Sequence, residues 1–167
     1  MIVSRKEIKK IAENLHKQNE KIIFTNGCFD ILHRGHIEYL KDAKKLGDVL
    51  IIGLNSDDSV KIIKGENRPI NSEEDRAEIL SQLKPVDFVV IFNEDTPYEL
   101  IKSIVPDILV KGGDWKIEEI IGSDIVIKNG GKVKSLKYFP TSSTSNIIKK
   151  IIALENCKIK KNLIKEI

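Results

Sequence analysis

The sequence predicts an α/β protein built on a parallel sheet with helices on both faces. Four times along the chain, a short run rich in β-branched residues is followed by a segment with the apolar spacing of a helix. This alternation is typical of βαβ units, whose crossover helices bury both faces of a sheet. The chain has no internal repeat and no low-complexity linker, and 167 residues match the size of one domain. We therefore predict a single Rossmann-like domain.

Composition and charge give little support to a nucleic-acid partner, and they fit a small anionic substrate equally well. The net charge of +3 comes from 28 basic and 25 acidic residues, too weak an excess to indicate a nucleic-acid partner. The longest apolar stretch, Val49 to Leu54, is far too short to span a bilayer, and the first residues show no cleavable signal, so we expect no membrane partner. Cys28 and Cys157 are too few for a disulfide framework, which predicts a cytoplasmic protein.

The first predicted elements are a helix and a buried strand. Ser4 and Glu7 have the spacing of a capping box, and apolar residues follow at helical spacing, which predicts an amphipathic helix within residues 1–19. The β-branched run from Lys21 to Thr25 predicts a buried parallel strand. Asn26 and Gly27 end that strand with residues that tolerate unusual backbone angles, so the chain turns there.

The segment after this turn has the features of a phosphate site. His33 and His36 are three residues apart, so both imidazoles project from one face of the first helical turn if Leu32 or His33 begins a helix. A helix start also offers unsatisfied N–H groups and the positive end of the macrodipole. Gly35 removes a side chain that would stand between the backbone and a ligand. The segment therefore predicts an anion-binding site.

Two other interpretations remain for the histidine pair. A structural zinc ion needs four ligands, and only Cys28 and Asp30 lie nearby in the sequence to complete the set. Alternatively, the two histidines are a solvated pair on a helix surface. We favour a phosphate site because a strand, a glycine turn and a helix in this order form a recurring ligand-binding geometry. The sequence lacks both the G-x-G-x-x-G and the Walker pattern, so dinucleotide redox chemistry and P-loop hydrolysis are not indicated.

The next segment places polar residues at the end of a second strand. Asp48 to Asn55 is apolar until Asn55, and Ser56 and Asp57 continue its polar end, where open parallel sheets bind ligands. Lys61 to Asn71 has the polar composition of a loop. Three cations of this loop face either solvent or a substrate: Lys61, Lys64 and Arg68.

The middle of the chain continues the alternation of helices and strands. Proline and acidic residues near the expected helix starts support these boundaries. The predicted elements are a helix over Glu73 to Leu83 capped by Asn71 or Ser72, a strand over Val86 to Phe92, a helix to about Ile104 that begins with a capping box at Thr96 to Glu99, and a strand over Asp107 to Lys111.

The last third of the chain predicts short strands and a final helix. Asp124 to Lys128 and Lys132 to Phe139 flank a glycine turn and are interpreted as two short β segments. The hydroxyl residues from Thr141 to Ser145 then precede a helix with isoleucines at helical spacing. Five hydroxyls at a helix start exceed what a cap needs and are suitable donors for phosphate oxygens. A flexible serine-rich connector is the alternative.

One stretch resembles a known signature, and four others make the likeness more specific. GCFDILHRGH, residues 27–36, resembles the signature of the HxGH nucleotidyltransferases, which join a nucleoside triphosphate to a phosphorylated small molecule and release pyrophosphate. Residues 8–151 as a whole are similar to the adenylyltransferase domain of ADP-heptose synthesis, which acts on D-glycero-β-D-manno-heptose 1-phosphate. The further stretches are GLNSDDSV (53–60), NRPINSEEDRAEIL (67–80), EDTPYELI (94–101) and DILVKGGDW (107–115).

This resemblance implies an activity and a role for individual residues. The activity is transfer of AMP from ATP to the heptose 1-phosphate, with a glycerol-3-phosphate-type cytidylyltransferase using CTP, or a non-catalytic nucleotide-binding module, as alternatives. The implied catalytic residues are His33, His36 and Lys64. The implied nucleotide-binding residues are Asn26, Gly27, Cys28, Phe29, Gly35, Asn55, Lys111, Gly112, Gly113, Asp114, Ser143, Thr144 and Ser145, with Lys111 to Asp114 in the turn that holds the base. The implied substrate-binding residues are Asp30, Lys64 and Arg68.

One departure from the related cytidylyltransferases bears on charge. Those proteins have an arginine about five residues before the serine of the last helix, and Tyr138 stands there in this chain. The triphosphate would then meet one cation fewer. Magnesium entering with ATP is the expected cofactor and would supply charge, and no residue of the chain is predicted as a metal ligand.

The resemblance also implies an organisation and partners. We expect one nucleotidyltransferase domain over residues 1–167, with a core at about 20–152, a helix at 1–19 and a helix end and tail at 153–167. The family's heptose kinase is often fused on the amino-terminal side, and Met1 to Glu20 leave no room for it, so we expect a separate kinase. A homodimer is expected from the family alone.

Overall fold

A single parallel sheet forms the centre of the molecule. The computed structural model describes residues 1–113, 115–137 and 143–165. Five strands lie in the order β3-β2-β1-β4-β5, and each pairs with its neighbours in parallel. Their bounds are β1 (Ile22–Gly27), β2 (Val49–Asn55), β3 (Phe88–Phe92), β4 (Ile108–Gly112) and β5 (Lys132–Leu136). The predicted Rossmann-like sheet is thus confirmed.

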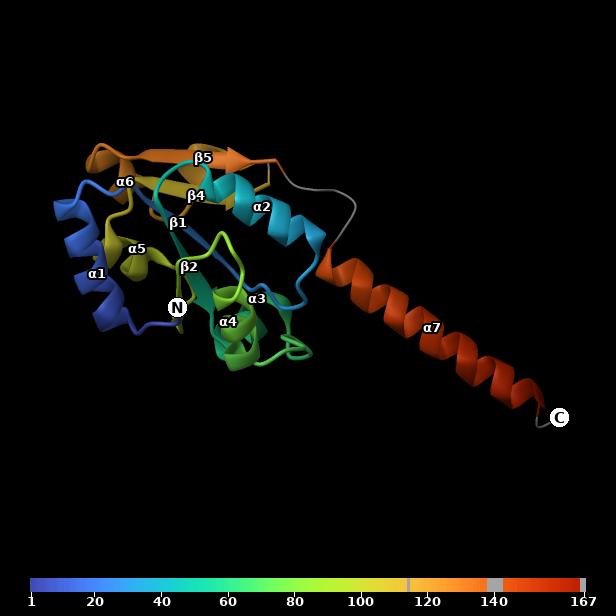
Figure 1. Cartoon of the computed structure of the whole chain (residues 1–167). Helices are drawn as coiled ribbons and strands as arrows, with labels where there is room; N and C mark the ends of the chain where they lie inside the picture. Colours follow the sequence, from blue (N-terminus) through green and yellow to red (C-terminus); the bar gives the residue numbers. More distant parts are fainter. Residues whose placement is uncertain (114, 138–142, 166–167) are drawn as a thin grey trace.

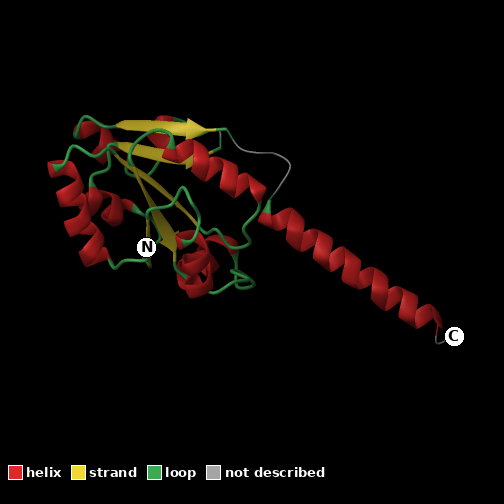
Figure 2. Cartoon of the chain, viewed as in Figure 1, coloured by secondary structure: helices red, strands yellow, loops and turns green. Residues whose placement is uncertain are grey.

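Helices cover both faces of this sheet (Figure 1, Figure 2). One face packs against α1, α5 and α6, and the other packs against α2 and α4. The bounds are α1 (Arg5–Lys17), α2 (Arg34–Lys44), α3 (Asp57–Lys64), α4 (Glu73–Ser81), α5 (Tyr98–Ile104), the 3-10 turn η1 (Ile117–Glu119), α6 (Ser123–Lys128) and α7 (Thr144–Lys165).

The core alternates along each central strand. In β1, Phe24 belongs to the cluster under α1 and α5, whereas its neighbour Ile23 belongs to the cluster under α2 and α4. In β2, Ile51 and Leu50 divide in the same way. Successive side chains of a strand point to opposite faces, so β-branched and aliphatic residues at every position fill both cores. This explains why the predicted strands contain continuous apolar runs.

The strand order creates a crevice at one edge of the sheet. From β1 the chain proceeds through β2 to β3 on one side, then crosses to β4 and β5 on the other. β1 therefore lies at the switch point, with Thr25 opposite Ile52 of β2 and Val110 of β4. In open α/β sheets the carboxyl ends of the strands at such a point form the ligand-binding crevice.

The amino-terminal helix forms as predicted. Ser4 caps α1, accepting a hydrogen bond from the backbone N–H of Glu7, and the Glu7 carboxylate accepts the N–H of Ser4 in return. Ile8 and Ala12 are buried against the sheet. The capping box and the apolar spacing were thus sufficient to place this helix.

The segment predicted as a loop over Lys61 to Asn71 is partly helical. Residues Asp57–Lys64 form α3, so Lys61 and Lys64 lie on a helix and only Gly65 onward is irregular. Ser56 begins the helix by accepting the N–H of Ser59 at 3.2 Å. The helix has 8 residues and buries only Ser59 and Val60, so it lacks the buried apolar face by which a sequence pattern identifies a helix.

The prediction of a β segment over Asp124 to Lys128 is wrong. These residues belong to α6, whose Val126 is fully buried against the sheet. A run of three apolar residues between two charged ones is compatible with either a strand or a helix, and only the contact with the sheet decides. The following strand is confirmed as β5, which pairs in parallel with β4, whereas residues 138 and 139 of the predicted strand lie outside the described residues.

The helix α5 starts differently from its prediction. Pro97 occupies the N-cap position with no side-chain hydrogen bond, so the capping box predicted at Thr96 does not form. The helix ends as expected near Ile104, because Val105 adopts a left-handed conformation with φ of 50° and Pro106 cannot continue it. The helix predicted over Glu73 to Leu83 and the strand predicted over Val86 to Phe92 are both confirmed. Their boundaries differ from the prediction by at most two residues.

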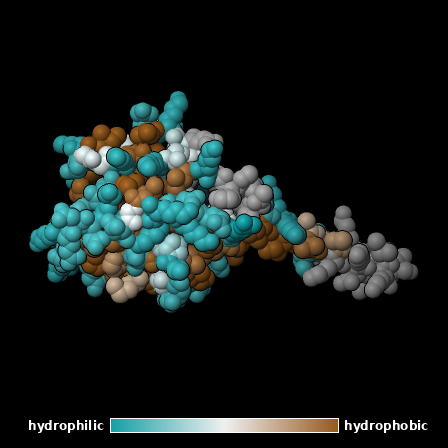
Figure 3. Space-filling view, turned by 45° about the horizontal axis from the view of Figure 1, so that its top comes forward, coloured by the Kyte–Doolittle hydropathy of each residue, from teal (hydrophilic) through white to brown (hydrophobic). Residues whose placement is uncertain are grey.

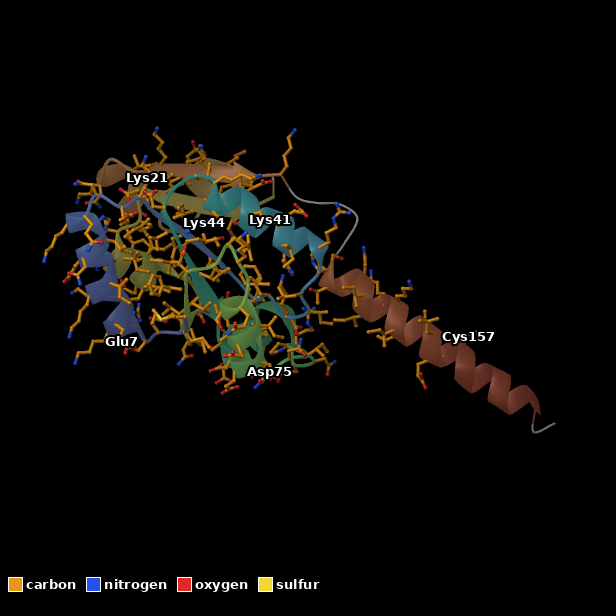
Figure 4. All side chains as sticks on the ribbon, in the orientation of Figure 1. Glu7, Lys21, Lys41, Lys44, Asp75 and Cys157 are labelled. Atoms are coloured by element: carbon orange, nitrogen blue, oxygen red, sulfur yellow. The ribbon has the colours of Figure 1, made fainter. Side chains whose placement is uncertain are left out.

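The last helix extends away from the body of the domain (Figure 1). Ile151, Ile152 and Leu154 are each more than half exposed on it, and apolar side chains are visible along its nearer part in Figure 3. Cys157 lies on this helix, far from the sheet, and both Cys157 and Cys28 are free thiols (Figure 4). In the described part of the chain, no helix is long and apolar enough to cross a membrane.

Candidate functional site

A cavity of about 590 Å³ opens at the carboxyl ends of β1 and β4. A smaller recess of about 160 Å³ shares part of its wall. Most of the predicted site residues line the cavity: Asn26, Gly27, Cys28, Phe29, Asp30, His33, His36, Asn55, Lys64, Arg68, Lys111, Gly112, Ser143, Thr144 and Ser145. Gly35 lines the recess, Gly113 lines neither space, and Asp114 lies outside the described residues.

The two histidines stack on one another at the start of α2. Their ring centroids are 3.8 Å apart with an interplanar angle of 20°, and the ring of Phe29 lies 5.3 Å from that of His36. His33 is the N-cap residue, one position before the helix, rather than part of its first turn as predicted. Its extended backbone still brings the imidazole over His36. The Nδ1 atoms of both rings are buried and have no hydrogen-bond partner in the described protein.

Burial determines the charge of this pair. The pKa of His36 is lowered to about 4, first by burial and then by the neighbouring His33, and burial also lowers the pKa of His33. Both imidazoles are therefore neutral at pH 7 in the free protein, and each can donate one N–H.

The turn after β1 brings the backbone to the cavity wall. Phe29 is buried and has a left-handed φ of 45°, unusual for a residue with a bulky side chain. Its ring packs over Gly27, where a Cβ atom would come within 3.0 Å of it. A side chain at Gly27 would therefore require the Phe29 ring to shift by a few tenths of an ångström. Between them, Cys28 is a half-buried thiol whose pKa is raised by burial.

Asp30 and Arg68 form a structural pair as well as part of the wall. The buried Asp30 carboxylate accepts the Nε–H of Arg68 at 2.6 Å and the backbone N–H groups of Ile70 and Asn71. The amide of Asn71 in turn donates to the Asp30 carbonyl at 2.7 Å. These bonds anchor the segment between α3 and α4 at the mouth of the cavity.

Sequence reasoning missed Arg76, which is 1% exposed within α4. Its guanidinium donates to the carbonyl oxygens of Cys28 at 2.6 Å, Asn55 at 2.8 Å and Asn71 at 3.0 Å, and it pairs with the Asp57 carboxylate at 2.7 Å. One side chain thus joins the ends of β1 and β2 to the segment before α4. Its position one turn before Leu80, on the apolar side of the helix, was the signal that could have identified it.

A second helix start lines the same cavity. Ser143 accepts the N–H of Asn146 at 3.1 Å, and Thr144 donates its hydroxyl to the carbonyl of Ile31 at 3.1 Å. The latter bond fixes the first turn of α7 against the segment that leads into α2. Tyr138, Thr141 and Ser142 lie outside the described residues.

Polar side chains of three strands complete the wall. Asn55 donates to the Ser59 hydroxyl at 2.9 Å, which orients its amide within the first turn of α3. The Lys111 ammonium donates to the Asn26 side-chain oxygen at 3.2 Å, and burial lowers the pKa of Lys111. Lys64 lies on the last turn of α3, exposed at the rim. Among the described residues, no three His, Cys, Asp or Glu side chains come together as they would around a metal ion.

Comparisons with known proteins agree on one family. Residues 24–150 match the family model described as cytidylyltransferase-like. The bifunctional protein HldE of Wolinella succinogenes is 57% identical over 150 residues, which cover 90% of this chain and 31% of that protein. HldE of Haemophilus influenzae is 55% identical over 155 residues, 93% of this chain and 33% of that protein. The chain thus spans about a third of the length of these curated relatives.

Two solved structures are similar. The lipopolysaccharide core biosynthesis protein of Thermoplasma volcanium has a TM-score of 0.60 and 34% identity, covering 74% of this chain and 99% of that one. Pantoate-beta-alanine ligase of Francisella tularensis has a TM-score of 0.59 with 20% identity, covering 82% of this chain and 66% of that one. At that level of identity, the second similarity shows the fold alone.

We expect Arg76→Met to lower the free energy of unfolding by about 3–5 kcal/mol, because the Asp57 charge and the backbone oxygens that Arg76 joins would lose their buried donor. Urea unfolding measures the change. Arg34→Met, which alters an exposed arginine of α2, is the control and should stay within about 0.5 kcal/mol of the wild type. A loss below about 1 kcal/mol for Arg76→Met would show that the network contributes little.

We also expect stability to decrease by about 2 kcal/mol between pH 7 and pH 5, because unfolded His36 takes up a proton near pH 6.5 whereas the folded side chain has a pKa of about 4. The contribution is present above pH 6.5 and is lost as the pH falls toward 4. In His36→Gln this part of the loss should disappear. Urea unfolding at both pH values tests it, and an equal loss in the two proteins would contradict the assignment to His36.

Proposed function

Because the chain belongs to the cytidylyltransferase-like family, we propose that it transfers AMP from ATP to D-glycero-β-D-manno-heptose 1-phosphate, giving ADP-heptose and pyrophosphate. The observation that carries this proposal is the meeting of two helix starts at one cavity. The histidine pair at the start of α2 and the hydroxyls at the start of α7 line the same space. Both elements offer N–H or O–H donors to anionic oxygens.

The size of the cavity supports a ligand larger than a single phosphate. A volume of about 590 Å³ is within the range of sites that bind nucleotides or drug-sized ligands. The bond between Thr144 and the Ile31 carbonyl keeps the start of α7 close to the start of α2. A triphosphate extended between them would meet the imidazoles at one end and the hydroxyls of Ser143 and Ser145 at the other.

The chemistry asks for positioning rather than a general base. A phosphate monoester has a second pKa near 6, so the sugar phosphate is already an anionic nucleophile at neutral pH. The protein then has to hold this oxygen in line with the α-phosphorus and stabilise charge on the phosphates. We assign that stabilisation to His33 and His36, whose buried Nδ1 atoms lack partners in the described protein. Phosphate oxygens beside them would raise their pKa values and favour the charged forms.

The acceptor side of the cavity is assigned to the segment between α3 and α4. Arg68 uses its Nε for Asp30. The other N–H groups of its guanidinium suit a sugar phosphate. Lys64, at the end of α3, is the second cation on this rim and is expected to contact the phosphates or the acceptor. Asp30 contributes chiefly by keeping Arg68 in place.

Magnesium is proposed to enter with ATP. In the described part of the chain, the carboxylates that line the cavity are Asp30, already bonded to Arg68, together with Asp95 and Glu119. This donor set fits an ion held mainly by phosphate oxygens, since Mg²⁺ in such sites uses few protein ligands. When bound, the ion would neutralise charge on the departing pyrophosphate.

The descriptions of two relatives are compatible with this proposal. The Thermoplasma protein is described as acting in lipopolysaccharide core biosynthesis, and the curated relatives are described as bifunctional. We propose that this chain corresponds to the nucleotidyl-transferring part of such proteins. A heptose kinase is the proposed supplier of the substrate, and a cytoplasmic homodimer is the proposed assembly.

An assay of pyrophosphate release tests the proposal. The protein would be supplied with ATP or CTP and with the α- or β-anomer of the heptose 1-phosphate, together with Mg²⁺. We expect release with ATP and the β-anomer, and formation of ADP-heptose. Release with CTP and glycerol 3-phosphate instead would identify a cytidylyltransferase. Saturable ATP binding without release for any sugar 1-phosphate would identify a non-catalytic binding module.

We expect His36→Ala to reduce turnover by at least about 10²- to 10³-fold while the protein stays folded, because a donor to the phosphates is lost. Steady-state rates of pyrophosphate release and a circular dichroism spectrum measure the two properties. His16→Ala makes the same chemical change on α1, outside the cavity, and should retain activity. A folded His36→Ala protein with wild-type turnover would remove the histidine pair from the mechanism.

A further inference from the structure

Lys111 is a cation that the fold holds partly out of water. It lies near the carboxyl end of β4 and lines both the main cavity and the smaller recess. Its ammonium donates to the neutral side chain of Asn26 at 3.2 Å, and it forms no ion pair with any described residue. Burial is the main reason that the pKa of Lys111 is lowered.

The other cations around the cavity are in different situations. Arg68 is paired with the buried Asp30, and Lys64 is exposed to water at the rim. Lys137, which lines the recess, is also exposed. Within the described ranges of the chain, Lys111 is therefore the cavity-lining cation that is both withdrawn from solvent and without a carboxylate.

A charge in this situation destabilises the free protein. Removing an ammonium from water costs free energy, and a neutral amide oxygen returns only part of it. Such a residue is expected where a ligand brings the opposite charge, so the cost is offset when the site is filled. A bound anion would relieve the free-energy cost of burying the Lys111 ammonium, and this relief would add to the binding free energy.

The surroundings of Lys111 indicate which part of a ligand it meets. The recess that it lines also contains Gly35 and His36 at the start of α2, and Gly27 and Cys28 in the turn after β1. A helix start attracts anions, and Lys111 approaches the same space from the neighbouring strand. Two independent sources of positive potential therefore face one small volume.

We infer that the Lys111 ammonium contacts a phosphate oxygen of the bound nucleotide, opposite the start of α2. This inference rests on the proposed function for the identity of the anion and extends it, because the resemblance places Lys111 in the turn that holds the base. A phosphate contact and a base-holding role make different demands. The first depends on the charge of the side chain, whereas the second depends on the backbone at Gly112 and Gly113.

Lys111→Met tests the inference, because it keeps the length of the side chain and removes its charge. Isothermal titration with ATP, AMP and adenosine should show ATP binding weakened at least about tenfold, with adenosine binding within about twofold of the wild type. The melting temperature of the ligand-free variant should rise by about 2–4 °C, because an unpaired buried charge has been removed. Lys134→Met, on the exposed side of the neighbouring strand β5, should change neither quantity.

Several results would overturn the inference. Equal weakening of ATP and adenosine would mean that Lys111 supports the base-holding turn, and unchanged ATP affinity would mean that it meets no phosphate. A lower melting temperature would show that its bond to Asn26 is structural. Failure of the proposed function appears separately: a wild-type protein that binds ATP but forms no ADP-heptose refutes the transfer, while the affinity ratios still decide the role of Lys111. A wild-type protein that binds no ATP would refute both.

Discussion

The buried guanidinium of Arg76 is the interaction on which the site depends. It bonds to the backbone at the ends of β1 and β2 and before α4, segments that approach each other only in the folded protein. Carbonyl oxygens at strand ends have no ladder partner and would otherwise need water or a loop to satisfy them. The Arg76 guanidinium supplies these donors, so the turn at Cys28 and the end of β2 can line the cavity although they form few hydrogen bonds with each other. Asp57 balances the charge, which makes the burial tolerable.

Several polar groups of the same cavity wall lack hydrogen-bond partners or opposite charges within the described protein. The histidine Nδ1 atoms lack partners in the described protein, and Lys111 has only a neutral one. Each of these groups is withdrawn from water before any ligand arrives, which lowers the pKa of the imidazoles and of the ammonium. Scaffold and site thus differ in chemistry. Arg76 bonds to Asp57 and to the backbone, and Asp30 bonds to Arg68 and to the backbone, whereas the histidine Nδ1 atoms and Lys111 have no charged partner in the described protein.

The sequence predicted the structure correctly where a short local pattern is compatible with only one kind of element. The capping box at Ser4, the β-branched strands and the spacing of His33 and His36 each led to the correct element or cluster. It failed where two periods fit a short run, as at Asp124 to Lys128, and where a mostly exposed helix had the composition of a loop, as in α3. Arg76 could not be assigned partners, because three of its acceptors are backbone oxygens 5 to 48 positions away and the fourth is the Asp57 carboxylate on another helix. The starts of α2 and α7 lie close together only because the chain crosses from β3 to β4, and no local sequence pattern predicts that crossover.

The helix α7 combines two properties that have a mechanical consequence. Its first turn is held to the Ile31 carbonyl by Thr144, and the rest of its 22 residues extend away from the sheet. At 1.5 Å per residue this makes a rod of about 33 Å, so a tilt of about 5° at the base sweeps the far tip through about 3 Å. The hydroxyls at the pivot hardly shift during the same swing. A tilt of the arm about its base would therefore displace the cavity-lining hydroxyls far less than the tip, because displacement grows with distance from the base.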